Sequence, residues 1–349
     1  MDAQPRLPLA MPPVAMPGRT EFEVSTPCAI PFDGDDWIFS VDWEGSRCLL
    51  AAQVDGSITL AGETAALDAR FPEIVAAGPL RGNAAAVLDG SICLLDAQGR
   101  PDLHALFDRV AGGSTGSLSA VYLATDLLHL NGESVALRPL RHRLAMLREV
   151  IPGESRIQLP DHVTGHGRAL AAATSQQGLS AVIARREEAP YRAGMASPER
   201  LRIALSERRD VVVVGWSSSA NPVRVILADF ADGRLGLLGW AALESGPAVR
   251  WLAGAVEASS DPPVDTAAAG SGVTWVRPRL VATVEPPRAR PRRLSVEMAE
   301  FALVALRDDV SPKWCVRRRP IDPPRASAQQ PLRPFSPTVL SALPIDGAA

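Results

Sequence analysis

The sequence offers few side chains that could attack a substrate. Lysine, whose amine is a common nucleophile, occurs once, at Lys313, and the other 35 of the 36 basic residues are arginines, which stay protonated. Carboxylates occur at two turn signals: Asp42 and Glu44 precede a glycine in the first, and Asp89 precedes one in the second. Their oxygens suit magnesium, so Asp42 with Glu44, or Asp42 with Asp89, is a candidate ligand pair. The alternative is that these carboxylates have no catalytic role.

The elements that must position these residues alternate between strands and helices up to about residue 205. We expect strands over 37–41, 48–54, 57–60 and 121–130, and a strand pair, 85–88 and 92–95, joined by a turn at Asp89–Gly90. Helices are predicted over 65–77 and from the segment 137–140 to about residue 150. Further short β-prone runs then occupy 210–216, 223–230, 235–240, 273–276 and 280–284. Five short strands in about 110 residues suit a small barrel such as an OB-fold.

Composition and length indicate a two-domain protein. The chain has 349 residues, of which 46% are hydrophobic and 21% charged, and it contains no apolar run long enough for a membrane span. We divide it into a disordered Pro-rich segment (1–25), an α+β domain (26–206), an all-β barrel (207–316) and a disordered Pro/Arg-rich tail (317–349). The four cysteines form no C-x-x-C pair, and no signal peptide is recognisable, which favours a cytoplasmic location.

Charge is unevenly distributed along the chain. The net charge is −3, yet residues 277–333 carry 13 basic and 6 acidic side chains. This basic C-terminal third could contact DNA or another polyanion, although a solvated arginine-rich surface would give the same composition. His162 and His166 have the i, i+4 spacing of zinc ligands, but a glycine between them and the polar surroundings indicate a loop. We therefore expect no metal site.

Seven segments, in order, resemble motifs of the ATP-dependent DNA ligases, closest to the ligase domain of bacterial multifunctional end-joining ligases. They are F-S-V-D-W-E-G-S-R (39–47), L-D-A-R-F-P-E-I (67–74), A-V-L-D-G-S-I (86–92), Y-L-A-T-D-L-L-H-L-N-G-E-S (122–134), G-L-S-A-V-I-A-R-R (178–186), A-P-Y-R-A-G (189–194) and R-D-V-V-V-V-G-W (209–216). The resemblance implies an adenylyltransferase, or nucleotidyltransferase, domain with an ATP-grasp-like fold, followed by an OB-fold barrel.

The positions to which the resemblance assigns chemistry have changed residue type. Asp42 stands at the nucleophilic lysine, which in the family takes AMP from ATP as a phosphoramide, and a carboxylate cannot do so. Ser91 and Ser180 replace carboxylates that would contact ribose or metal. Thr125 replaces the aromatic residue that would stack on adenine, so it is a doubtful nucleotide contact. Arg47 is the one nucleotide-binding residue that clearly persists.

The end of the first domain departs from the family in the same way. Arg202 and Ala204 stand where two lysines would neutralise the triphosphate, and Arg200 replaces a nearby tryptophan. The family would use ATP and magnesium, and we expect neither as a cofactor here.

The resulting hypothesis is a pseudoenzyme, a ligase-like protein without self-adenylation that binds DNA or a DNA-repair protein and has no membrane contact. One alternative is an active ATP-dependent DNA ligase in DNA repair or recombination, which requires a nucleophile that the motifs do not supply. Another is a protein-interaction scaffold that does not bind DNA.

Overall fold

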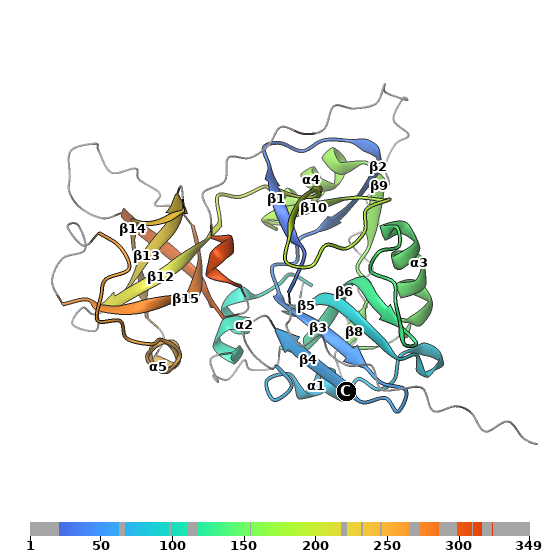
Figure 1. The fold of residues 1–349 in the computed structure, drawn as a ribbon, viewed down its shortest axis with the longest axis horizontal. Coiled ribbons are helices and arrows are strands. Elements are labelled where there is room, and N and C mark those ends of the chain that lie inside the picture. The colour runs from blue at the N-terminus through green and yellow to red at the C-terminus, as the bar shows by residue number, and fades with distance from the viewer. Residues whose placement is uncertain are drawn as a thin grey trace, which may run out of the picture.

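The computed structural model describes residues 21–62, 67–97, 99–110, 118–153, 155–217, 222–231, 233–244, 246–265, 272–285, 299–308, 310–315 and 323. Residues 1–20 and all of the predicted tail except residue 323 lie outside these ranges. Among the described residues, no helix has both the length and the apolar character to cross a membrane. The described part consists of two sheets packed together and a separate barrel (Figure 1).

The first sheet brings together strands from both ends of the α+β domain. Its spatial order is β1 (Val24–Cys28), β11 (Ala196–Ala204), β10 (Ala181–Arg186), β2 (Gly34–Val41) and β9 (His162–Gly165). The helix α4 (Gly167–Gln176) packs on β2 and β10. Leu170 and Ala171 of α4 join Phe39 and Val182 of the sheet in one buried apolar cluster. That burial fixes the first sheet against its helix.

The second sheet contains the middle of the domain and its largest core. Its order is β4 (Ile58–Gly62), β3 (Ser46–Ala52), β5 (Ala86–Leu94), β6 (Ala120–Leu130) and β7 (Glu133–Ser134), with β8 (Ile157–Gln158) parallel to β6. The short α1 (Pro72–Val75) and α3 (Leu140–Val150) pack on it, and the single turn η1 (Arg81–Asn83) contacts α3. Leu144 and Leu147, one helical turn apart on α3, are both buried in this core.

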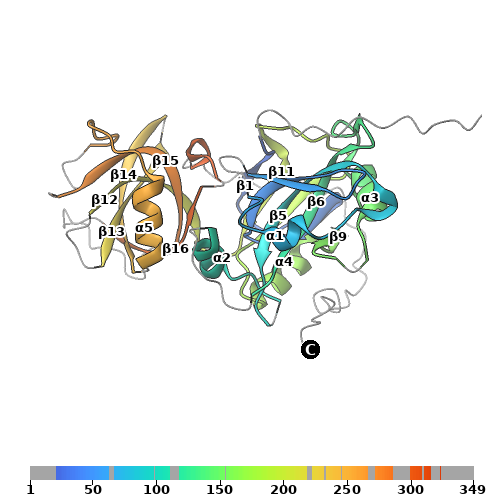
Figure 2. The same cartoon turned by 90° about the horizontal axis from the view of Figure 1, so that it is seen from below.

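The third unit is a closed five-stranded barrel. Its strands follow the order β12 (Arg209–Ser217), β13 (Val223–Ala231), β14 (Arg234–Leu243), β16 (Ala299–Arg307) and β15 (Thr274–Glu285). The helix α5 (Gly246–Ala255) connects β14 to β15 and packs on the barrel, and the single turn η2 (Pro312–Trp314) follows β16 (Figure 2). Closure pairs every strand on both sides, so the barrel has no free edge.

The helix α2 (Leu103–Val110) joins the two parts. It lies between the sheets and the barrel in both views (Figures 1 and 2). Phe107 belongs to the barrel core and meets Trp251 edge-on, with 5.4 Å between the ring centroids, whereas Leu106 and Val110 belong to the core of the second sheet. One helix therefore contributes to two hydrophobic cores.

The α+β fold and the following barrel are as predicted, but several boundaries are not. The segment predicted as a strand pair joined by a turn at Asp89–Gly90 is one continuous strand, β5. Gly90 is needed for packing, because a Cβ there would collide with the Tyr122 ring and the Leu123 carbonyl oxygen. The runs 273–276 and 280–284 likewise form the single strand β15, whose pairing with β12 shifts register around Pro278.

Three other predictions were wrong at element boundaries. Within the described part of the predicted helix over 65–77, only α1 is helical. Asp68 accepts a 2.6 Å hydrogen bond from the Leu60 amide, and residues 68–70 form turns. Residues 162–165, predicted as a loop, form β9 because they pair with β2. The Pro-rich segment cannot extend to residue 25, because Val24 and Ser25 begin β1 and Glu23 is buried.

Candidate functional site

A tight turn carries Asp42 between the two sheets. The strand β2 ends at Val41 in one sheet and β3 begins at Ser46 in the other, so residues 42–45 cross from sheet to sheet. Glu44 has a left-handed backbone (φ 49°), and its amide donates a 3.3 Å hydrogen bond to Asp42 Oδ1. A Cβ at Gly45 would collide with the Ile92 carbonyl oxygen. The glycine of the motif is thus required by the backbone, whatever the chemistry.

Asp42 forms an ion pair with Arg202. The Arg202 Nε donates to Asp42 Oδ2 at 2.7 Å, and its Nη2 lies 3.5 Å from Ser180 Oγ. Burial would raise the pKa of Asp42, but the charge and hydrogen bond of Arg202 outweigh it and hold that pKa below its ordinary value. Asp42, Arg202 and Ser180, three positions that depart from the resembled motifs, are therefore in contact, and the Asp42 carboxylate is fixed by Arg202.

Ala204 does not join this group. It lies exposed near the end of β11, pairs with Ala181 and does not line the cavity described below. A methyl side chain at this position cannot neutralise a phosphate.

Arg47 is held by protein groups. Its Nε and Nη2 donate to the two oxygens of Asp89 at 3.1 and 2.6 Å, its Nη1 donates to the Glu23 carbonyl oxygen at 2.7 Å, and it stacks over the Phe22 ring. Asp89 is fully buried and also accepts a 2.9 Å hydrogen bond from Tyr191 Oη. Asp89 does not line the cavity, so the candidate magnesium pair of Asp42 with Asp89 was wrong.

Ser91 and Thr125 both line the cavity beside Arg47. Ser91 pairs with Arg47 across β3 and β5, and the Thr125 hydroxyl donates a 3.2 Å hydrogen bond to the Asp89 carbonyl oxygen. Neither side chain offers a carboxylate or an aromatic face. The changed residues thus stand at the cavity wall without the chemistry that the resemblance assigns to their positions.

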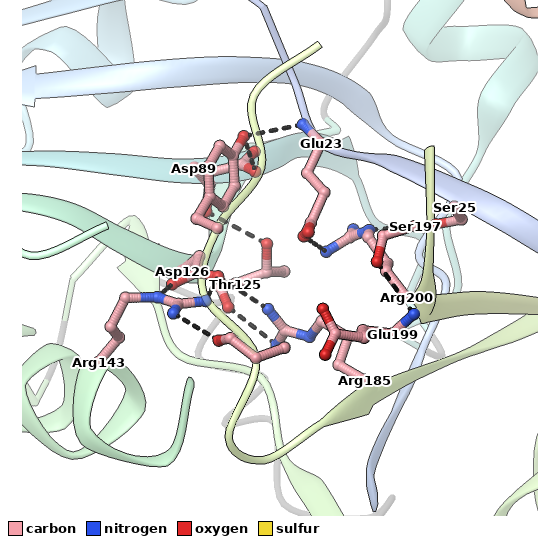
Figure 3. A network of polar contacts seen from close by, with 12 residues as sticks. Glu23, Ser25, Asp89, Thr125, Asp126, Arg143, Arg185, Ser197, Glu199 and Arg200 are labelled. Atoms are coloured by element: carbon pink, nitrogen blue, oxygen red, sulfur yellow. Dashed lines mark hydrogen bonds and ion pairs between the residues drawn. The ribbon is translucent and has the colours of Figure 1, made fainter. Parts of the chain in front are cut away.

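Behind this wall lies a buried ionic network that motif reasoning missed (Figure 3). Asp126 accepts hydrogen bonds from Arg143 at 2.7 and 2.9 Å and from Arg185 at 3.1 Å. Burial, with Arg200 and Arg143 nearby, lowers the pKa of Arg185 to about 10. Asp126 belongs to a matched motif, which is a signal that could have marked it. Of its two arginine partners, Arg185 also belongs to a matched motif, 178–186, whereas Arg143 lies outside the seven segments and carried no such signal.

A cavity of about 400 Å³ lies between the α+β domain and the barrel. Its charged lining residues are arginines from both domains together with three carboxylates: Arg47, Arg185, Arg200, Arg202, Arg208, Arg209, Arg307, Asp42, Glu44 and Asp210. Burial and the neighbouring Asp42 raise the pKa of Glu44, whereas Ser180 and Arg208 act in the opposite direction. The turn that carries Asp42 and Glu44 therefore faces an arginine-rich space between the two domains.

Arginine contacts keep the barrel against this turn. Arg208, at the domain junction, reaches Glu44 at 3.3 Å and Glu285 of β15 at 2.8 Å. Arg307 of β16 donates a 3.0 Å hydrogen bond to the Gly45 carbonyl oxygen. Lys313 is exposed in η2 and does not line the cavity, although Val310 and Cys315 on either side of it do. Lys313 follows the last barrel strand, β16, in a segment that returns to the cavity.

The donor set does not fit magnesium–ATP. Within the described part of the chain, no three His, Cys, Asp or Glu side chains are grouped as a metal ion would require. In the cavity, Asp42 and Glu44 are already bound by arginines, whose positive charge opposes a cation. His162 lies in β9 and His166 precedes α4, and they are not part of a metal-binding group.

Comparison with a solved structure supports the fold assignment. The fold is similar to that of a mycobacterial DNA ligase D complexed with ATP and MES, with a TM-score of 0.59 and 22% identity over 86% of this chain and 98% of that one. The architecture is therefore that of a DNA-ligase adenylation domain followed by an OB-like barrel.

A family model described as an ATP dependent DNA ligase domain matches residues 28–203, and the chain belongs to the ATP-dependent DNA ligase family. Among curated relatives, it is 26% identical over 295 residues to the multifunctional non-homologous end joining DNA repair protein LigD of Mycobacterium tuberculosis. The match covers 80% of this chain but only 37% of that protein. It is also 22% identical over 204 residues to the SPbeta prophage-derived DNA ligase-like protein LigB of Bacillus subtilis, covering 58% of this chain and 73% of LigB.

Proposed function

We propose that this member of the ligase family binds DNA without forming a covalent adenylate. The observation that carries the proposal is the ion pair between Asp42 and Arg202, at 2.7 Å, in the turn where the family places its nucleophile. A carboxylate held ionised by a guanidinium has no amine to accept AMP, and it repels a triphosphate. The changes at Ser91, Thr125 and Ser180 remove ribose, base and metal contacts from the same site.

DNA binding is supported by the family and by the charge of the C-terminal third. Residues 277–333 carry 13 basic and 6 acidic side chains, many of them outside the described ranges. Arg277 and Arg279 both form ion pairs with Glu257, so part of this charge is compensated locally. A DNA contact would therefore depend mainly on the other arginines of this third.

Self-adenylation is tested with ATP labelled in its α-phosphate, in the presence of magnesium. We expect no acid-labile label on the protein, with an active ATP-dependent ligase as the positive control. The alternative is an active ligase that uses a lysine at another position as its nucleophile. We test it with a variant of Lys313, because the neighbouring Val310 and Cys315 line the cavity. A label that Lys313→Arg abolishes would establish that alternative and refute the proposal.

DNA binding is tested with a fluorescent nicked duplex in a salt titration. The logarithm of the affinity should fall linearly with the logarithm of the salt concentration, and a chain ending at residue 316 should show a shallower slope. If the full chain does not bind at low salt, the protein acts instead as an interaction scaffold. If the slope is unchanged by the truncation, the tail is not the contact segment.

A further inference from the structure

The helix α2 and the strand β16 exchange side chains between two hydrophobic cores where they lie side by side (Figure 2). Phe107 of α2 is buried in the barrel core beside Trp251. In the opposite direction, Val304 of β16 packs against the core of the second sheet. A cavity of about 20 Å³ remains between α2 and β16, which is room for about one water molecule. The two domains therefore share apolar packing at this point.

Polar contacts hold the barrel at a second place, the turn that carries Glu44. The guanidinium group of Arg208 lies 3.3 Å from Glu44 in the α+β domain and 2.8 Å from Glu285 in the barrel strand β15. Arg307 of β16 donates a 3.0 Å hydrogen bond to the Gly45 carbonyl oxygen. Rotation of the barrel about the apolar contact of α2 would break these polar contacts. The two sets of contacts together therefore restrain the barrel more than either would alone.

The chain that connects the two domains is short and hydrogen-bonded. Only residues 205–208 separate β11 from β12. The amides of Leu205 and Ser206 both donate to the Ser180 carbonyl oxygen, at 2.7 and 3.2 Å, and Leu205 packs against the apolar cluster of the first sheet. A hinge needs residues whose backbone torsions can change, and two of these four residues are held by the first sheet.

We infer that the barrel and the α+β domain form one rigid body, held by the exchanged side chains Phe107 and Val304, by the Arg208 bridge and by the fixed connection. Domains that meet through polar interfaces normally move relative to each other, whereas a hydrophobic interface opposes that motion. The barrel therefore does not rotate away from the turn that carries Glu44 when a partner binds. A partner meets a surface that exists beforehand.

The test is the distance between spin labels on the two domains of the full chain, measured by double electron–electron resonance. The native cysteines are buried, so the labels are attached at Ser134→Cys in β7 and Ser260→Cys in the loop after α5, two exposed positions. We expect one narrow distance distribution, with a mean that shifts by less than about 2 Å when a nicked duplex is added. Two populations in the free protein, or a larger shift with the duplex, would overturn the inference.

Variants identify the contacts that hold the domains. Phe107→Ala and Arg208→Met should each shift or split the distribution by more than about 2 Å, because each removes one of the two restraints on the barrel. Arg208 is partly exposed, so Arg208→Met decides the question if Phe107→Ala does not fold. Arg277→Met breaks an exposed ion pair with Glu257 inside the barrel domain, and as the matched control it should leave the distribution unchanged. Distributions as narrow as that of the unsubstituted chain in both test variants would refute the inference.

The rigid joint and the proposed DNA binding can fail separately. A narrow distribution in a chain that does not bind the duplex would support the joint and refute DNA binding. A distance that changes when the duplex binds would support DNA binding and refute the joint.

Discussion

The contact between Asp42 and Arg202 predicts a measurable coupling energy. We consider Asp42→Asn, Arg202→Met and the double variant. Two unit charges about 4 Å apart interact by about 4 kcal/mol at an effective dielectric constant of 20. The two side chains are 25% and 33% exposed, and solvent screening reduces this value, since fully exposed pairs contribute only about 0–1 kcal/mol. We therefore expect a coupling of about 1–2 kcal/mol.

Urea denaturation of the four proteins measures this coupling as the deviation from additivity. The exposed pair Arg192–Glu199, at 3.2 Å with side chains 44% and 36% exposed, gives a matched control cycle in which we expect less than about 0.5 kcal/mol. Additivity within about 0.3 kcal/mol at positions 42 and 202 would refute the reasoning. It would mean that the pair does not hold the carboxylate in place.

The coupling should also depend on pH with a definite sign. The pKa of Asp42 is lowered in the folded protein, so the pair stabilises the fold at and above the unfolded-state pKa. This stability is lost as the pH falls through the lower folded-state pKa. A coupling that vanished on raising the pH from 5 to 8 would contradict the assignment of the charge to Asp42.

Four further predictions concern the surroundings of the site. Asp126→Asn should lower the free energy of unfolding by about 3–5 kcal/mol in urea, because it leaves two buried guanidinium groups without a counter-charge; an unchanged midpoint would show that the network is not structural. Phe107→Ala should cost about 3–5 kcal/mol and make the barrel melt apart from the sheets in calorimetry, and a single unchanged transition would contradict the role given to α2. The pKa of Glu23 is raised in the folded protein, so its contribution to stability is greatest below its unfolded-state pKa and is lost as the pH rises through the folded-state value. Glu23→Gln should therefore make the free energy of unfolding fall less steeply above about pH 4.5. An equally steep fall in the variant would show that other groups cause it. Asp42→Lys alone should remain unlabelled by α-labelled ATP, because the new ammonium would lie beside Arg202 and the other changes would remain; labelling would show that only the nucleophile is missing.

The architecture was readable from the sequence because scaffold motifs are local. The strand β2, the turn with Gly45 and the start of β12 each depend on neighbouring residues. The Asp89–Gly90 prediction failed for a tertiary reason. Asp-Gly favours a turn in isolation, but here the glycine accommodates Tyr122 from the adjacent strand. Local turn propensity could not show that constraint.

The contacts of the site were less accessible to sequence reasoning. Asp42 and Arg202 are 160 positions apart in the sequence. They lie close together in the fold because β2, which Asp42 follows, and β11, which carries Arg202, flank the same strand, β10, in the first sheet. Sequence comparison identified both positions as changed but could not show that they bind each other. Glu23 lies in a segment assigned to disorder and is buried beside Arg200. Its role depends on β1 pairing with β11, which requires the whole sheet.

The changed residues form a mutually consistent set. An arginine at position 202 facing a lysine at position 42 would bring two cations together, whereas an aspartate at position 42 satisfies the arginine and is kept ionised by it. The hydroxyl of Ser180 is a weaker acceptor for Arg202 than a carboxylate would be. Asp42 is therefore the stronger of these two partners of Arg202, and the ion pair between them is favoured. The pair of Asp42 and Arg202 thus forms part of the cavity wall. Arg200 is held in the same wall by other groups: its Nη1 lies 3.7 Å from a Glu23 oxygen, and its Nε donates a 3.1 Å hydrogen bond to Ser25 Oγ.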